Sequence, residues 1–121
     1  MSPRRSAASR KAPLKNASLR NSAPIFAALG DETRLRLVAV LCAGGAVSIA
    51  QLTSGTAITR QAVTKHLHVL ADAGLVQHVK VGRERQWQFE PTRLEEARRS
   101  LDLIARQWDQ ALQKLKMAVE A

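Results

Sequence analysis

One stretch, residues 58–75, constrains this chain more than any other, because its apolar residues follow the pattern of a strongly two-sided helix. Val63, Leu67 and Leu70 recur at steps of four and three residues, the spacing by which a helix packs one side on a core. The other side contains no acid and consists of Arg60, Gln61, Thr64, Lys65 and His68. Side chains of this kind suit phosphates and base edges, as on a recognition helix in a major groove.

The ends of this helix are also marked in the sequence. Thr59 is a good N-cap, because its hydroxyl can accept a bond from a free backbone N–H of the first turn. Gly74 suits the left-handed stop. We therefore predict a recognition helix over residues 59–73. A helix with one apolar and one basic side is also typical of an ordinary solvated surface helix, so the neighbouring segments decide between the two interpretations.

A short helix is predicted immediately before it. Ser48 and Gln51 have the spacing of a capping box, and Gly55 lies where a helix of one and a half turns would end. A short capped helix, a tight turn with glycine and a longer basic helix form a helix-turn-helix. The shortness of the turn supports this, because it leaves the two helices only one way to pack.

After Gly74 the apolar period changes to about two, over residues 75–81 and 85–90 on either side of Gly82. This predicts a hairpin whose residues facing the helices are Val76, Trp87 and Phe89. The basic wing 80–85 carries the cations at or near its tip, Lys80, Arg83 and Arg85. A basic hairpin after a helix-turn-helix is typical of a wing that reaches a minor groove. A plain surface hairpin is the alternative.

Two helices are predicted before the helix-turn-helix. A short one begins at Pro24 and stops at Gly30, and Asp31 caps the next, which ends at Gly44. The expected buried stripe of the second helix consists of Leu35, Val38, Leu41 and Cys42. A cysteine on that stripe is expected to be a small buried hydrophobic residue and not a reactive thiol.

From Pro91 the chain is predicted to be helical to its end. A heptad seam with alternating steps of three and four is formed by Leu94, Ala97, Leu101, Ile104, Trp108, Ala111, Leu115 and Ala118. Too little domain remains to cover this seam, so we expect a homodimer. The expected interface residues are Leu94, Leu101, Ile104, Trp108, Ala111 and Leu115. Alternatively, Trp108 packs within its own chain, against Phe26 or the first helix.

The 121 residues suffice for one domain, and 19 Lys+Arg against 10 Asp+Glu give a net charge of +9, which favours a polyanionic partner. We expect a disordered basic arm over 1–21, either brushing DNA or only solubilising, and a winged helix-turn-helix domain over 22–118. One cysteine excludes an intramolecular disulfide and fits a reducing compartment. Neither a secretory signal nor a membrane span is predicted, so the expected location is cytoplasmic.

Three segments resemble the ArsR/SmtB family of winged-helix bacterial repressors: F-A-A-L-G-D-E-T-R-L-R-L-V (26–38), T-R-Q-A-V-T-K-H-L-H-V-L-A-D-A-G-L-V (59–76) and G-R-E-R-Q-W-Q-F (82–89). The resemblance covers about residues 22–117. It implies a mainly α fold with a small β-hairpin and a homodimer joined through the first and last helices. It also implies two recognition helices on successive major grooves of a palindromic operator in double-stranded DNA, and repression of transcription.

The sequence departs from the metal-sensing members of that family. Those members place Cys-x-Cys in the first helix of the helix-turn-helix, or Asp/His pairs on the last helix. Here residues 49–53 contain no ligand, and the last helix has Asp102 and Asp109 but no histidine. Zinc needs about four converging ligands. The chain therefore resembles the branch without a metal; we expect no cofactor, and the sequence names no inducer.

Two other functions compete with a DNA-binding repressor. A metal- or redox-responsive sensor of the same fold would use Cys42 or the histidines, and zinc or oxidant added to an operator-binding assay separates the two. A winged-helix module that binds only proteins would not need basic residues on both helix and wing. An enzyme is disfavoured, because the sequence has neither a Gly-rich phosphate loop nor a Cys–His pairing in view.

Overall fold

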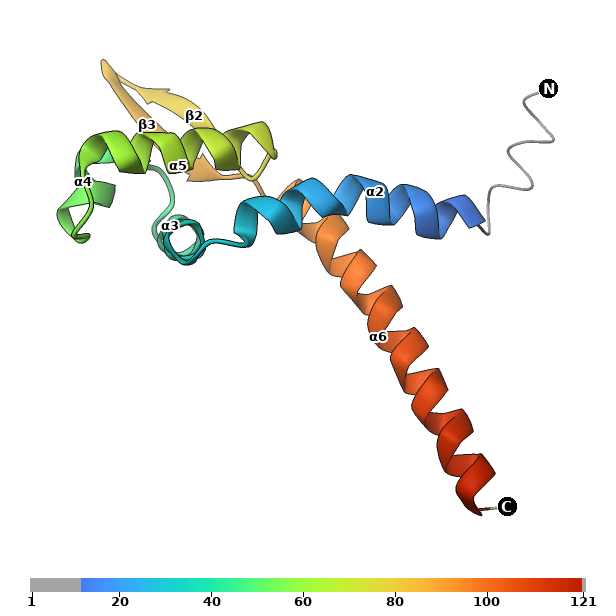
Figure 1. Ribbon diagram of the computed structural model, residues 1–121. Coiled ribbons are helices and arrows are strands. Elements are labelled where there is room, and N and C mark those ends of the chain that lie inside the picture. The colour runs from blue at the N-terminus through green and yellow to red at the C-terminus, as the bar shows by residue number, and fades with distance from the viewer. Residues whose placement is uncertain (1–11, 121) are drawn as a thin grey trace, which may run out of the picture.

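The computed structural model describes residues 12–120 and confirms a mainly α architecture with a small antiparallel sheet (Figure 1). The elements in chain order are α2 (Ala12–Leu29), α3 (Glu32–Gly44), β1 (Val47–Ser48), α4 (Ile49–Ser54), α5 (Arg60–Asp72), β2 (Val76–Val81), β3 (Glu84–Phe89) and α6 (Pro91–Glu120). Figure 1 shows the long α6 leaving the body near α2 and projecting away from the other elements. The part of the expected N-terminal arm at 1–11 lies outside the described residues.

The two helices of the helix-turn-helix begin and end as their capping residues predict. Ser48 and Gln51 form the capping box of α4: the Gln51 amide N–H donates to the Ser48 hydroxyl at 3.2 Å, and Ser48 N–H donates to Gln51 Oε1 at 2.9 Å. At the start of α5 the Thr59 hydroxyl accepts the Ala62 N–H at 3.1 Å. Gly74, with φ +81°, gives the left-handed turn that ends α5.

The predicted hairpin forms, and a third strand joins it. β2 and β3 pair antiparallel around the turn at Gly82, whose φ is +65°. The two-residue β1 pairs with the other edge of β3, placing Val47 opposite Trp87, so the strand order is β1-β3-β2. The sequence alone predicted no strand at Val47–Ser48. So short a segment has no detectable periodicity, and only the folded chain brings it beside β3.

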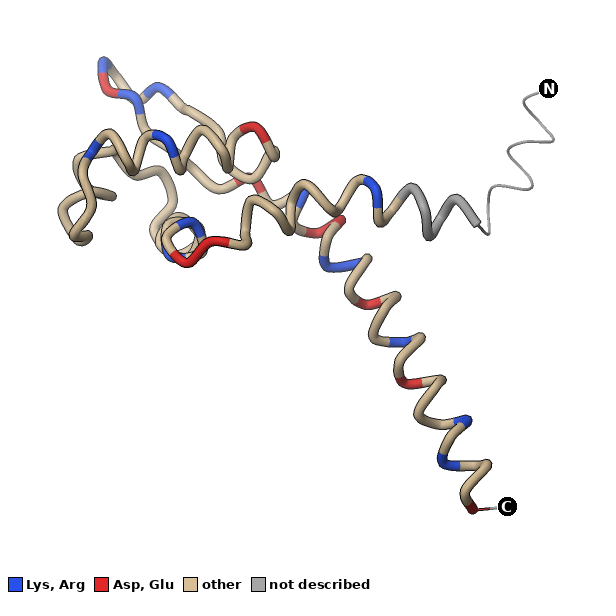
Figure 2. The backbone as a smooth tube through the Cα atoms, viewed as in Figure 1, with Lys and Arg blue, Asp and Glu red and all other residues tan. Residues whose placement is uncertain are grey.

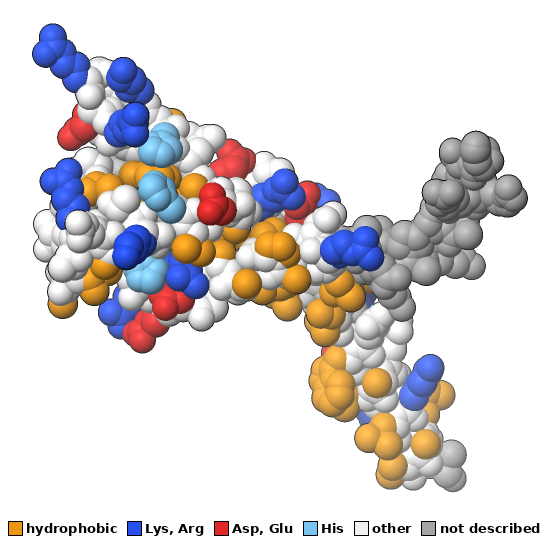
Figure 3. Space-filling model, turned by 45° about the horizontal axis from the view of Figure 1, so that its top comes forward, with side chains coloured by type: hydrophobic (Ala, Val, Ile, Leu, Met, Phe, Trp, Pro, Cys, Tyr) orange, Lys and Arg blue, Asp and Glu red, His pale blue; other side chains and the backbone are white. Residues whose placement is uncertain are grey.

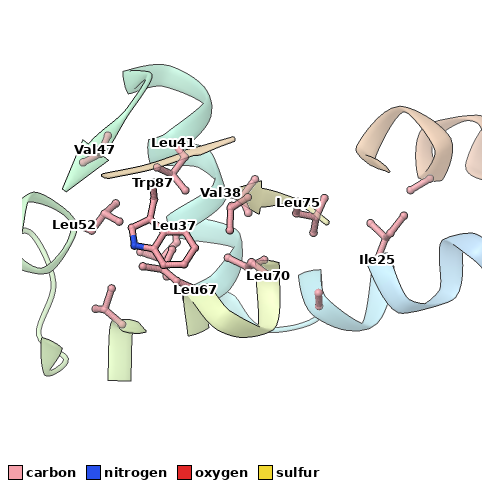
Figure 4. Packing of buried hydrophobic residues seen from close by; sticks show 14 residues of the cluster. Ile25, Leu37, Val38, Leu41, Val47, Leu52, Leu67, Leu70, Leu75 and Trp87 are labelled. Atoms are coloured by element: carbon pink, nitrogen blue, oxygen red, sulfur yellow. The ribbon is translucent and has the colours of Figure 1, made fainter. Parts of the chain in front are cut away.

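The core lies between α3, α5 and the sheet (Figure 4). Val63, Leu67 and Leu70 of α5 are all fully buried, with Trp87 of β3 3% exposed beside them. Burial of a large apolar side chain contributes roughly 1.5–3 kcal/mol. The apolar side of the predicted recognition helix is therefore its core side. Val76 is also buried and Phe89 is half-buried against the cluster, which confirms the inward side of the hairpin.

The predicted buried stripe of α3 was partly wrong. Val38 and Leu41 are buried as expected, but Leu37 is the third core residue, while Leu35 is 51% exposed and Cys42 is exposed. Apolar residues occupy nearly every position of this helix between 35 and 43, so its periodicity does not select one side. The neighbours of α3 select it instead.

The helix expected to begin at Pro24 begins at Ala12, with the proline inside it. Residues 12–23 lack an apolar period, and a proline in a helix interior removes one backbone hydrogen bond, so the sequence favoured a later start. Contact with α6 stabilises the earlier one. Ser22 and Ser100 are buried and their hydroxyl oxygens are 2.7 Å apart, which brings α2 and α6 close together.

Asp31, the predicted cap of α3, gives a testable pH effect. One of its carboxylate oxygens accepts the Arg34 N–H at 3.0 Å, and this bond lowers the pKa of Asp31 below its ordinary value, with the Arg34 charge acting in the same direction. A lowered pKa means that this contribution to stability is present at neutral pH and is lost as the pH falls through the folded-state pKa. Asp31→Ala should therefore melt earlier than wild type at neutral pH but converge with it in acid. A melting difference that persists unchanged at low pH would contradict this.

Candidate nucleic-acid interface

The outward side of α5 presents the five polar residues predicted for it. Arg60, Gln61, Lys65 and His68 are exposed and Thr64 is half-buried, and together they line one shallow hollow in the surface. The Thr64 hydroxyl donates to the Arg60 carbonyl at 2.9 Å. Because its proton is used there, this hydroxyl presents acceptor lone pairs outward. The side therefore combines donors, acceptors and cations on a helix whose other side is fully buried.

The wing places its cations together. In the register of the hairpin Lys80 lies opposite Arg85, and both are exposed, as is Arg83 in the turn. Figure 2 shows Lys and Arg gathered at the free end of the hairpin, with one acidic position among them. That acid is Glu84, whose carboxylate accepts the Gln86 side-chain amide at 3.1 Å. The predicted cluster of wing cations is thus assembled at the hairpin tip.

Within residues 18–120, whose side chains the structure describes, the cations of α5 and of the wing have no carboxylate partner. The Lys and Arg ion pairs in that range are Arg36–Glu32, Arg93–Glu96 and Arg98–Glu95, all within α3 or α6. Figure 3 shows the wing and α5 contributing Lys, Arg and His atoms to one face of the molecule. Unpaired cations concentrated on one face attract phosphates.

An aromatic contact that was not predicted from the sequence joins the wing to α5. The Trp87 ring lies 4.0 Å from the ring centre of His78 and 6.1 Å from that of His68. His78 and Trp87 are register partners in the hairpin, so counting outward from the turn at Gly82 would have revealed their contact. His68 comes from α5, and only the fold places it there. His68 of α5 and His78 of β2 therefore lie against the same indole, that of Trp87 in β3.

The predicted seam of α6 is exposed along most of its length. Leu101, Ile104, Trp108 and Leu115 are 52%, 48%, 63% and 61% exposed, and Ala111 is exposed as well. Figure 3 shows hydrophobic atoms on this side of α6. Leu94 and Ala97 differ, because Leu94 is half-buried against the core of its own chain and Ala97 is fully buried in it. The exposure of Trp108 shows that it does not pack on Phe26 within the chain, so that alternative was wrong.

The sequence also predicted a chain without a bound metal ion. Among the described residues no group of three or more His, Cys, Asp or Glu could hold a metal ion. Cys42, expected in the core, lies exposed on α3 instead. In the described part of the chain no helix is long and apolar enough to cross a bilayer.

The short α4, the two-sided α5 and the basic hairpin together define a winged helix-turn-helix protein.

Comparison with known proteins identifies the family. Residues 29–79 match a family model described as a helix-turn-helix domain. The HTH-type transcriptional regulator YuzN of Bacillus subtilis (strain 168) is 41% identical over 71 residues, which span 54% of this chain and 77% of that protein. The HTH-type transcriptional regulator Rv2034 of Mycobacterium tuberculosis is 39% identical over 85 residues, 70% of this chain and 76% of that protein.

A solved structure gives the same result. The ArsR-like transcriptional regulator from Rhodococcus sp. RHA1 matches with a TM-score of 0.73 and 36% identity, over 84% of this chain and 94% of that one. The chain belongs to the ArsR-type family of winged helix-turn-helix transcriptional regulators, which confirms the resemblance. It is a transcriptional regulator with a helix-turn-helix DNA-binding domain, and not an enzyme.

Proposed function

We propose that the chain is a homodimeric repressor that binds a palindromic operator through α5 and the basic wing. The observation that carries this proposal is the exposed, acid-free side of α5, whose cations have no ion-pair partner among the described side chains and face the same way as those of the wing. Arg60, Gln61 and Thr64 are assigned to base edges, with Arg60 also able to bind a phosphate. Lys65 is assigned to a phosphate, and His68 completes the surface.

Dimer formation is supported by the exposed stripe of α6. A contiguous apolar surface on a soluble protein marks an interaction site, and a second copy of the same helix is its simplest complement. Two copies would place their recognition helices one DNA turn apart, roughly 34 Å, on the two half-sites of a palindrome. Joining two half-site readers also makes the second binding event intramolecular, which raises the overall affinity.

The test begins by selecting operators from random-sequence DNA duplexes with the purified protein. We expect the selected sequences to contain an inverted repeat, and footprinting should show protection of two successive major grooves on one side of the duplex. A reporter placed behind the selected operator should be repressed when the protein is expressed. Selection without sequence enrichment would reject the proposed readout, and reporter activation would reject repression.

The wing gives a separate prediction. Arg83 follows Gly82 in the hairpin turn and is exposed, so its side chain can reach the negative potential of a narrow minor groove. Arg83→Ala should weaken operator binding several-fold and flatten the salt dependence by about one unit, without lowering the melting temperature. Arg98→Ala removes the same charge from α6, where the arginine is paired with Glu95, and should change neither quantity. Equal behaviour of the two variants would contradict the role of the wing.

A further inference from the structure

The Arg34 guanidinium lies where α2, α3 and α5 meet. Its Nε donates to the carbonyl oxygen of Ala28, in the last turn of α2, at 2.5 Å. Its Nη1 lies 3.2 Å from Nδ1 of His66, in the middle of α5. Arg34 itself belongs to the first turn of α3 and is half-buried. One side chain thus bonds both a helix that packs on α6 and the candidate recognition helix.

The chemistry of these two bonds fixes the role of each partner. Arginine only donates hydrogen bonds, so Nδ1 of His66 must be the acceptor in its bond with Arg34. The last carbonyls of a helix have no partner within the helix, so the Ala28 carbonyl is a natural acceptor. A planar guanidinium presents donors in a fixed fork and can hold two acceptors in one geometry, which the ammonium of lysine cannot.

This link constrains α5 in a way that its core packing does not. Val63, Leu67 and Leu70 hold the helix through apolar contacts, which have no preferred direction. A hydrogen bond weakens steeply when its geometry changes. A helix with side chains is about 10–12 Å across, so a rotation of roughly 10° about its axis shifts the side chains by about 1 Å. A shift of that size disrupts a bidentate base contact.

We propose that Arg34 is a positioning residue for DNA recognition, because its bond to His66 fixes the rotation of α5 relative to α2 and α3. This inference rests on the proposed readout by α5. His66 does not lie on the outward side of α5, which is formed by Arg60, Gln61, Thr64, Lys65 and His68. It therefore acts by orienting those residues and not by contacting DNA itself. Loss of the link leaves the cations in place but misaligns the residues that read bases.

The expected signature is a loss of specificity rather than of all binding. Phosphate contacts tolerate small displacements and provide nonspecific affinity, whereas base contacts provide discrimination. Arg34→Met and His66→Leu should each weaken binding to the selected operator roughly tenfold, the scale of one lost base contact. Binding to a random duplex should change less than about twofold, with the salt dependence conserved. Because both variants break the same bond, the double variant should lose little more than either alone.

Matched controls keep the test decisive. Arg36→Met removes an exposed arginine of the same helix that pairs only with Glu32, so operator binding should stay at the wild-type level. His66→Asn keeps a side-chain acceptor near the position of Nδ1 and should retain most of the specificity. Arg34→Lys keeps the charge but not the fork, and should behave like Arg34→Met. If Arg34→Met does not fold, Arg34→Lys and the two His66 variants carry the same comparison.

Three outcomes would overturn the inference: wild-type specificity in the folded Arg34 and His66 variants, a parallel fall in operator and random-duplex binding, or additive losses in the double variant. Arg60→Ala and Gln61→Ala, measured on the same two duplexes, separate this failure from that of the proposed function. If they lose specificity while the Arg34 variants do not, only the positioning role is wrong. If they bind like wild type, the readout by α5 is itself wrong.

Discussion

Replacing Trp108 by alanine is expected to raise the dimer dissociation constant and to weaken operator binding at low protein concentration. The indole is 63% exposed in the chain by itself and lies in the middle of the stripe formed by Leu101, Ile104, Ala111 and Leu115. A tryptophan buries on the order of 200 Å² in an interface, and central aromatic residues dominate interface energies. By analogy with large-to-small changes at buried sites, the dimer should lose about 3 kcal/mol.

Sedimentation of the folded variant at sub-micromolar concentration measures this effect directly. Because Trp108 makes little contact with its own chain, the melting curve at high protein concentration should change less than the dissociation constant. Operator binding should partly recover as the protein concentration is raised. Gln110→Ala, on the opposite side of the same helix, is the matched control and should sediment like wild type. A fully dimeric Trp108→Ala protein would reject the proposed interface.

The second large effect is expected on the outward side of α5. Arg60→Ala, Gln61→Ala and Thr64→Ala should each cost roughly 1–3 kcal/mol on the selected operator and relax its specificity, because each removes a group assigned to a base edge. Lys65→Ala should instead weaken all sequences alike and flatten the salt dependence by about one unit, as expected for a phosphate contact.

Titrations of the selected operator and of a random duplex at several salt concentrations distinguish these two classes of variant. Gln113→Ala changes an exposed amide on α6, far along the chain from α5, and should bind both duplexes like wild type. Wild-type affinity and specificity in all three variants of Arg60, Gln61 and Thr64 would show that α5 does not read the operator. The α4–α5 unit would then need another role.

The sequence predicted the helix-turn-helix closely, because its signals are local. The Ser48 and Thr59 caps and the Gly74 stop lie beside the backbone groups that they satisfy, so a few residues determine each helix end. The two-sided pattern of α5 is equally local, since helical geometry alone decides which of its residues share a side. The five outward residues were therefore identified without knowledge of any neighbouring element. The position of the wing cations near a hairpin tip was predicted from the apolar period of two in the flanking segments and from Gly82 between them.

The tertiary structure alone decided features that depend on segments far apart in the chain. The apolar residues of α3 lack a clear period, so the packing of neighbouring elements selected Leu37 for the core and left Leu35 and Cys42 outside. The helical turns of α2 before Pro24 bring Ser22 into a buried contact with Ser100, 78 residues away. Neither contact has a local signature in the sequence.

The link from Arg34 to His66 illustrates the same division. Arg34 is not among the apolar residues of its helix, and the sequence alone does not indicate what it contacts. Only the packing of α2, α3 and α5 brings its guanidinium within bonding distance of Ala28 and His66. Helical periodicity determined which residues α5 can present to DNA. The angle at which it presents them depends on long-range contacts, because the orientation of a helix is set by what it packs against.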